Sequence, residues 1–269
     1  MKKLLFVLFS LLSISASAQN TQNEEPLDTL SQEQKELVIS LAEPFFLHKV
    51  DSVMEEGMYM QALEALDSLH YNWIKITWKG LSPQIYTRKA QIYMSLEEWQ
   101  QLIDATNECI KYNKETMSDR MAALIYSMQG LGYRNLEDFK NAIRSNEYAL
   151  SYYSKDGDYG NQGDMLCSIA YNYDKLGKLS AASSFYQKGF MKFLQSFDIT
   201  KKQLLHSNLK VDDSYKETLM GVFAAHLYNM ALFEQDYGDR LASKEYLLMS
   251  SHCGSSTARS EYQRIYGRY

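Results

Sequence analysis

Residues 126–150, YSMQGLGYRNLEDFKNAIRSNEYAL, have the pattern of two short helices joined by a tight turn. The small residues are Gly130, Ala142 and Ala149, the aromatic residues beside them are Tyr133 and Phe139, and a polar turn spans 135–138. Small side chains let two helices approach closely, and aromatic rings fill the space beside each close contact. We therefore predict a helical hairpin at this point of the chain.

The same residue classes recur every 40 residues, so this hairpin is one unit of an array. In the first helix of each unit, the small or apolar position holds Val50, Ala90, Gly130 and Ala170, and the position three residues later holds Val53, Tyr93, Tyr133 and Tyr173. The turn position holds Gly57, Glu97, Glu137 and Gly177. The three matching positions of the second helix hold first Tyr59, Trp99, Phe139 and Leu179, then Ala62, Leu102, Ala142 and Ala182, and last Leu69, Cys109, Ala149 and Gly189. So many classes in phase indicate an internal repeat. The two helices of each unit are called helix A and helix B.

A fifth unit follows with a slipped phase. Its matches, which lie 60 rather than 40 residues after those of the fourth unit, are Met230, Phe233, Ala242, Tyr246 and Met249. The extra residues fall at 196–213, where Leu204, Leu205 and Leu209 predict a short amphipathic segment. We favour a connector packed on the fourth unit over an insertion that contacts a partner. The predicted repeats span about 43–82, 83–122, 123–162, 163–195 and 214–252.

Capping signals predict where helices begin. Ser31 and Gln34 form a capping-box pattern, which predicts an opening helix of about ten residues that Pro44 ends or kinks. Further N-caps are expected at Ser82 before Pro83, at Ser118, at Asn161, and at Ser214 with Glu217 as its capping-box partner. A closing helix at 256–267 is expected to cover the end of the array, with Ala258, Tyr262, Ile265 and Tyr266 on one face.

These residues resemble the tetratricopeptide repeat. The matches are Tyr126, Gly130, Tyr133, Phe139, Ala142 and Ala149 in the third unit, Ala170, Tyr173, Gly177, Ala182 and Tyr186 in the fourth, Gly57, Tyr59 and Ala62 in the first, and Ala242 and Tyr246 in the fifth. The usual period is about 34 residues, and the longer one here is similar to the arrays of kinesin light chains and of bacterial peptide-pheromone receptors. The resemblance implies an all-α fold, a right-handed α–α superhelix of about five hairpins with N- and C-terminal capping helices, in one domain at 31–269.

The resemblance also implies a concave groove, lined by helices A, that holds a peptide or a partner helix. The register places on its wall Gln91, Met94, Leu131, Arg134, Asn135, Tyr171, Asp174 and Lys175. This mixture suits an extended peptide, because backbone amides need partners and side chains need pockets; the alternative is a solvated helix face without a ligand. A receptor for chaperone tails is disfavoured, since the places of its clamping Lys hold Leu47, Thr87, Ser127 and Cys167.

The N-terminus has the pattern of an export signal. Lys2 and Lys3 precede an apolar run at 4–12, and small residues follow at 16–18. A helix of about 11 residues rises about 16 Å, roughly half of a bilayer core. We expect a signal peptide at 1–18, cleaved between Ala18 and Gln19, a disordered leader at 19–30, and an exported mature protein, periplasmic or otherwise extracytoplasmic, with no integral membrane segment.

Charge and cysteine usage narrow the function classes. The formal net charge of −5 becomes −7 without Lys2 and Lys3, and an acidic balance argues against nucleic acid as a partner. Three cysteines leave at least one unpaired. Cys109 and Cys167 fall on helices too far apart to bridge, and Cys253 is expected in a Ser/Gly-rich loop, so no disulfide framework is predicted.

Three patterns that resemble chemical sites have simpler accounts. The Tyr93, Tyr133 and Tyr173 stripe has helical spacing, which favours packing over a stacking platform. The segment 156–161 resembles the start of a calcium loop, but Cys167 stands where its chelating Glu belongs, so a capped turn is favoured. The histidines, which are His48, His70, His206, His226 and His252, lack metal-ligand spacing, and the adjacent His252 and Cys253 are interpreted as loop. No catalytic, metal or cofactor residue is assigned.

Three functional hypotheses remain. The first is a non-enzymatic, exported scaffold that binds a protein or peptide partner in the groove. The second is an extracytoplasmic sensor component of a signalling system that acts through a membrane partner, because exported arrays of this kind are similar to sensor regions of Bacteroidetes. The third, an enzyme built on an α-solenoid, is the least favoured, because no catalytic signature is present.

Overall fold

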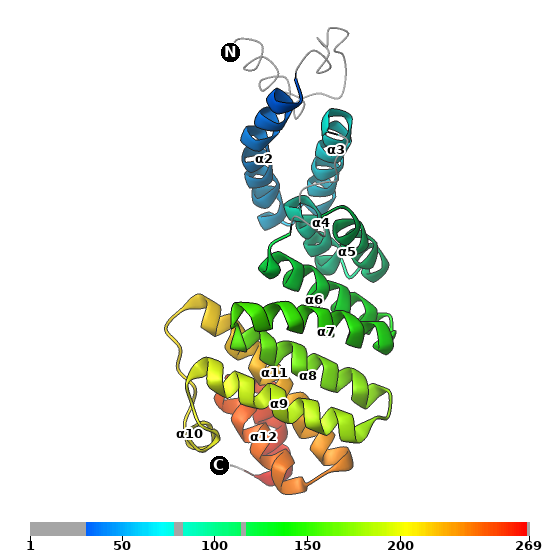
Figure 1. Ribbon diagram of the computed structural model, residues 1–269. Coiled ribbons are helices and arrows are strands. Elements are labelled where there is room, and N and C mark those ends of the chain that lie inside the picture. The colour runs from blue at the N-terminus through cyan, green and yellow to red at the C-terminus, as the bar shows by residue number, and fades with distance from the viewer. Residues whose placement is uncertain (1–30, 78–82, 114–116, 268–269) are drawn as a thin grey trace. The chain divides into compact units, whose positions relative to one another are not determined.

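The computed structural model describes residues 31–77, 83–113 and 117–267 (Figure 1). The expected signal peptide, the leader and the Ser82 cap lie outside these residues. Every regular element in the described ranges is a helix, which confirms the all-α prediction. None of the helices in these ranges has both the length and the apolar character needed to cross a membrane. The chain divides into two compact units at Met117–Ser118, so the single domain expected at 31–269 stays a prediction.

Unit 1 contains two helical hairpins. The first pairs α2 (Gln32–Glu55) with α3 (Tyr59–Thr77), and the second pairs α4 (Pro83–Ser95) with α5 (Trp99–Asn113). Of the two outcomes expected at Pro44, an end or a kink of the opening helix, the end is wrong, because α2 continues through this proline. The opening helix and helix A of the first repeat are therefore one element.

Unit 2 contains three hairpins, a connector and a closing helix (Figure 1). The hairpins are α6 (Asp119–Asn135) with α7 (Phe139–Asp156), α8 (Tyr159–Lys175) with α9 (Leu179–Phe197), and α11 (Ser214–Tyr237) with α12 (Arg240–His252). The connector holds α10 (Lys201–His206), and the chain closes with α13 (Ser256–Tyr266). Helices α6, α8 and α11 are the helices A of this unit.

The turn inside each of the first four hairpins has the same backbone conformation. Gly57, Glu97, Glu137 and Gly177 have φ angles of 75°, 58°, 60° and 70°. In the third hairpin the Glu137 amide donates to Arg134 O at 3.0 Å and the Asp138 amide donates to Tyr133 O at 2.9 Å. This left-handed cap closes helix A, and helix B begins two residues later, at Tyr59, Trp99, Phe139 and Leu179. The 40-residue register is confirmed at these turns.

Small residues allow the close helix contacts that the sequence predicts. A Cβ atom on Gly130 would lie 2.1 Å from Asn146 Oδ1 on α7, and one on Gly189 would lie 2.4 Å from Cys167 Sγ on α8. Neither position has space for a larger side chain. The second-helix packing positions, Ala62, Leu102, Ala142 and Ala182, are all fully buried.

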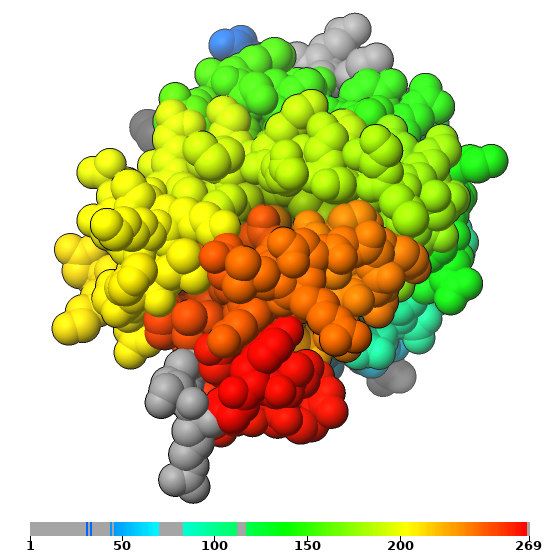
Figure 2. Space-filling model, turned by 90° about the horizontal axis from the view of Figure 1, so that it is seen from below, coloured from blue at the N-terminus to red at the C-terminus, as the bar shows by residue number. Residues whose placement is uncertain are grey.

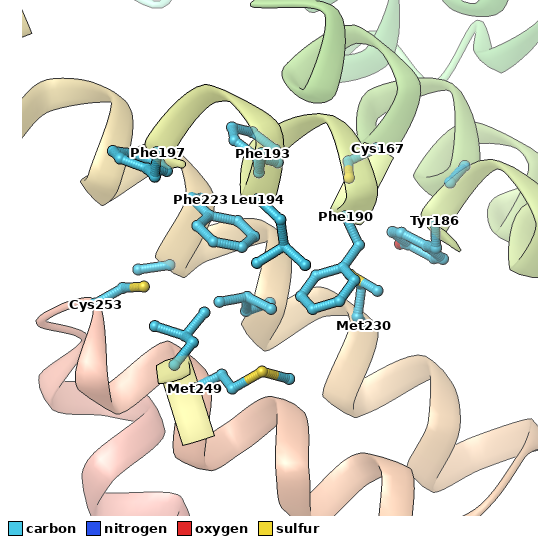
Figure 3. Close-up of a cluster of buried hydrophobic side chains, with 14 of the residues drawn as sticks. Cys167, Tyr186, Phe190, Phe193, Leu194, Phe197, Phe223, Met230, Met249 and Cys253 are labelled. Carbon is cyan, nitrogen blue, oxygen red and sulfur yellow. The ribbon is translucent and has the colours of Figure 1, made fainter. Parts of the chain in front are cut away.

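The largest core of unit 2 lies where the fourth and fifth hairpins meet (Figure 3). Phe193 of α9 stacks on Phe223 of α11, with ring centroids 4.5 Å apart. Figure 3 shows the labelled side chains of α9 converging with those of α11 and α12. Leu204 of α10 is buried in the same core, so the connector contributes to it.

The connector packs on the fourth unit, as expected, through the core that Leu204 shares with α9, and it packs on the fifth unit as well. His252 Nδ1 of α12 lies 2.7 Å from Leu204 O, and the Leu209 amide donates to His252 O at 3.0 Å. Lys201 Nζ lies 2.6 Å from Glu245 Oε2, also on α12. In Figure 2 the connector (yellow) lies beside the orange α11–α12 hairpin, against which α13 (red) packs.

Several terminal details differ from the predictions. Ser118 caps α6 as expected, but Asp158 rather than Asn161 caps α8, and Asp213 rather than Ser214 caps α11. Ala258 and Tyr262 of α13 are buried, whereas Ile265 is exposed. Cys253 is the buried C-cap of α12 rather than part of an open loop.

Candidate partner-binding face

Six of the eight predicted groove residues lie together on unit 2. Leu131, Arg134 and Asn135 are on α6, and Tyr171, Asp174 and Lys175 are on α8. Gln91 and Met94 are half-buried on α4 of unit 1 and are described separately. The six residues of unit 2, together with Asp236 of α11, are called the helix-A face below.

Two cations meet over one aromatic ring of the helix-A face. The guanidinium carbon of Arg134 lies 5.7 Å from the ring centroid of Tyr171, and Lys175 Nζ lies 5.1 Å from the same centroid. Arg134 comes from α6 and the other two residues from α8, so these contacts join neighbouring helices A. Within the described ranges neither cation has a carboxylate within 4.0 Å. The pair therefore presents positive charge around a half-buried tyrosine.

Asn135 is engaged by its own helix. Its Nδ2 donates to Leu131 O at 2.9 Å, which satisfies a carbonyl near the end of α6. Asn135 is exposed and Leu131 half-buried. These two residues thus flank Arg134 at the α6 end of the helix-A face, and the amide oxygen of Asn135 faces no donor among the hydrogen bonds described.

The helix-A face also carries two acidic groups, Asp174 of α8 and Asp236 of α11, on helices that pack against each other. Burial raises the pKa of Asp174 above its usual value, Lys175 opposes this increase, and the negative charge of Asp236 adds to it. Asp236 lies in the last turn of α11 and was not predicted, because the phase slip hides which residues of α11 face α8. An acidic residue at the C-terminal end of a helix, where the helix dipole disfavours it, was the available signal.

A partly buried pair joins α8 to α11. His226 Nε2 lies 2.7 Å from Asp164 Oδ1, and the imidazole packs on Phe193 with ring centroids 5.8 Å apart. His226 Nδ1 is buried without a hydrogen-bond partner in the structure. The pair links the helices that carry Asp174 and Asp236, so we interpret it as a positioning contact for the helix-A face.

The other sequence patterns have structural roles. Tyr173 packs against Phe185, with centroids 5.5 Å apart, as the packing interpretation predicts. The calcium-like segment is a capped turn, in which Gly157 ends α7 and the Asp158 carboxylate accepts from the Asn161 amide at 3.0 Å. Among the described residues no group of three potential metal ligands occurs. At the places of a clamping Lys, Leu47, Thr87 and Cys167 are buried.

No family model and no curated protein matches the sequence. A solved structure of putative kinesin light chain TPR-like repeats from Podosopora anserina has 13% identity and a TM-score of 0.53, and the match covers 82% of this chain and 96% of that one. A single-substitution variant of it has 14% identity and a TM-score of 0.54, with 80% and 96% covered. This chain has the tetratricopeptide-repeat fold. A structure of MamA matches at 20% identity and a TM-score of 0.47, covering 62% of this chain and 89% of its own.

The tetratricopeptide-repeat fold was thus predicted correctly from the periodic residues. At these identities the likeness concerns the fold alone. The charged side chains and Tyr171 of the helix-A face lie between the small and aromatic packing positions that define the repeat.

Proposed function

We propose that this protein is an exported, non-enzymatic scaffold that binds a segment of a partner protein on its helix-A face. The observation that supports this function best is the half-buried Tyr171 between Arg134 and Lys175. A tyrosine offers a large contact area for little loss of side-chain entropy, and Tyr and Arg are the residues that most often dominate binding energy. The residues between the packing positions of the repeat therefore supply an anchor.

The buried thiols support a non-enzymatic role. Burial raises the pKa of both Cys109 and Cys253 to about 12, and it raises that of Cys167 well above its usual value. The thiolate is the nucleophilic form, so these residues stay protonated and unreactive at neutral pH. The adjacent His252 is already occupied, because its Nδ1 lies 2.7 Å from Leu204 O.

Export rests on the signal pattern at 1–18. N-terminal sequencing of the protein recovered from its native envelope tests it, and the expected first residue is Gln19. Recovery of a chain that still begins at Met1 in the cytoplasm would contradict export and leave the binding proposal intact.

The binding proposal is tested by crosslinking and affinity capture of the mature protein with its envelope, followed by quantitative comparison of variants. Arg134→Ala plus Tyr171→Ala removes the anchor and is expected to deplete the specific partner. The matched control is Arg144→Ala plus Tyr148→Ala, a pair on α7 with the guanidinium carbon 5.9 Å from the ring centroid. Partners retained equally by both double variants would show that the helix-A face does not bind them.

A further inference from the structure

Charge changes sign across the helix-A face. Arg134 of α6 and Lys175 of α8 lie around Tyr171, whereas Asp174 and Asp236 lie in the last turns of α8 and α11, two helices that pack against each other. Tyr171, Asp174 and Lys175 share one side of α8, because residues three and four positions apart are neighbours on a helix. A partner polypeptide that lies across this face from α6 to α11 would therefore contact positive charge first, then an aromatic ring and then negative charge.

The positive half has a structural explanation, but the negative half does not. Arg134 and Lys175 lie in the last turns of α6 and α8, where the helix dipole favours cations. Asp174 and Asp236 lie in the last turns of α8 and α11, where the dipole disfavours anions. Within the described ranges neither carboxylate has a cation within 4.0 Å. Both carboxylates therefore lie where the helix dipole opposes their charge, and such local conflicts concentrate at functional sites.

Building on the proposed function, we propose that the helix-A face recognises a bipolar polypeptide segment. An acidic side chain of the partner binds Arg134 and Lys175, its neighbouring residue packs on Tyr171, and a Lys or Arg side chain binds Asp174 and Asp236. Neighbouring helices lie about 8–10 Å apart and an extended chain advances about 3.3 Å per residue, which spaces the two partner charges about three to six residues apart.

The two signs of charge identify a polypeptide as the occupant. A nucleic acid offers only anionic phosphates to a protein surface, and Asp174 and Asp236 would repel them. An anionic membrane surface attracts clusters of basic residues, which this face lacks. A polypeptide is the partner that carries both charges on one chain at the required spacing.

The test is a selection from displayed random peptides of about 12 residues, with the mature protein as bait. The wild type is expected to enrich peptides with one acidic and one basic residue three to six positions apart. The double variant Arg134→Glu plus Lys175→Glu should abolish the preference for the acidic residue. The double variant Asp174→Lys plus Asp236→Lys should abolish the preference for the basic residue. Arg144→Glu plus Lys188→Glu, on α7 and α9 outside this face, should keep the wild-type preference.

A selected peptide is then measured by fluorescence anisotropy. Its Kd should rise about tenfold or more in Arg134→Gln plus Lys175→Gln, as expected for the loss of a charge-assisted hydrogen bond. The same rise is expected in Asp174→Asn plus Asp236→Asn. These neutral variants introduce no charge reversal. They replace the charge-reversed variants in the test if circular dichroism shows that the latter do not fold.

The two proposals fail in different ways. Enriched peptides that require Tyr171 but show no charge pattern would overturn the bipolar recognition and leave the binding function standing. If the wild type enriches nothing beyond what Tyr171→Ala enriches, the binding function is wrong and the bipolar recognition is wrong with it.

Discussion

The third hairpin and the junction between the fourth and fifth hairpins are packed by different means. In the third hairpin, α6 and α7 approach at Gly130, and Ser145 Oγ donates to Gln129 Oε1 at 2.8 Å in the buried interface. At the junction, large rings such as Phe193 and Phe223 fill the space between α9 and α11. The aromatic packing coincides with the phase slip, so at this junction bulky rings fill the space between helices that the 40-residue register does not align.

The largest expected effect is at this junction. Phe193→Ala should lower the free energy of unfolding by about 3–5 kcal/mol, because it removes a fully buried ring and leaves a cavity. Chemical denaturation followed by circular dichroism measures the change. Phe185→Ala is the control on the same helix, since Phe185 is only partly buried. This variant should lose clearly less free energy of unfolding than Phe193→Ala. Equal losses would show that the aromatic junction is not the main core.

The third hairpin should respond to added volume instead. Gly130→Leu is expected to destabilise the protein by about 1–3 kcal/mol or more, because its side chain would overlap Asn146. Gly221→Ala on α11 is the control: its Cβ would meet nothing within 4 Å, and it should stabilise the helix by about 0.5–1 kcal/mol. Thermal melts compare the two variants. A Gly130 variant with wild-type stability would contradict the predicted register.

The sequence predicts the first four hairpins well because local rules specify them. The turn at Glu137 and the helix start at Phe139 follow from the 40-residue spacing. The sequence does not predict that α11 packs against α8 or that Leu204 O lies 2.7 Å from His252 Nδ1, because both contacts involve residues on or beyond the inserted connector. The sequence also does not decide between an end and a continuation of the helix at Pro44, because a proline removes one helix hydrogen bond but the residues around it can still extend the helix.

The acidic end of the helix-A face gives a smaller, pH-dependent effect. The pKa of Asp174 is raised in the folded protein, so the folded state binds this proton more tightly than the unfolded state. The free energy of unfolding then falls as the pH rises from the usual Asp range through the raised pKa. The Asp174→Asn variant avoids this loss. Its melting temperature should therefore be higher than that of the wild type at pH 7 and equal to it at acidic pH.

Asp119→Asn is the control for the pH effect. Asp119 lies in the first turn of α6, where the helix dipole favours it, and pairs with Lys155 at 3.1 Å. Its replacement should lower the melting temperature slightly at pH 7, the opposite direction to Asp174→Asn. The same sign for both would contradict the electrostatic conflict between α8 and α11.

The smallest effect compares the turns of the third and fourth hairpins. Glu137 adopts a φ of 60° and Gly177 one of 70°, but only glycine does so without strain from a Cβ. Gly177→Ala should therefore destabilise the protein by about 1 kcal/mol. Glu137→Gly should raise the free energy of unfolding by less than about 1 kcal/mol, because glycine also loses more conformational entropy on folding. Denaturation of both variants at one pH measures the difference, and a stabilising Gly177→Ala would show that the left-handed caps do not limit stability.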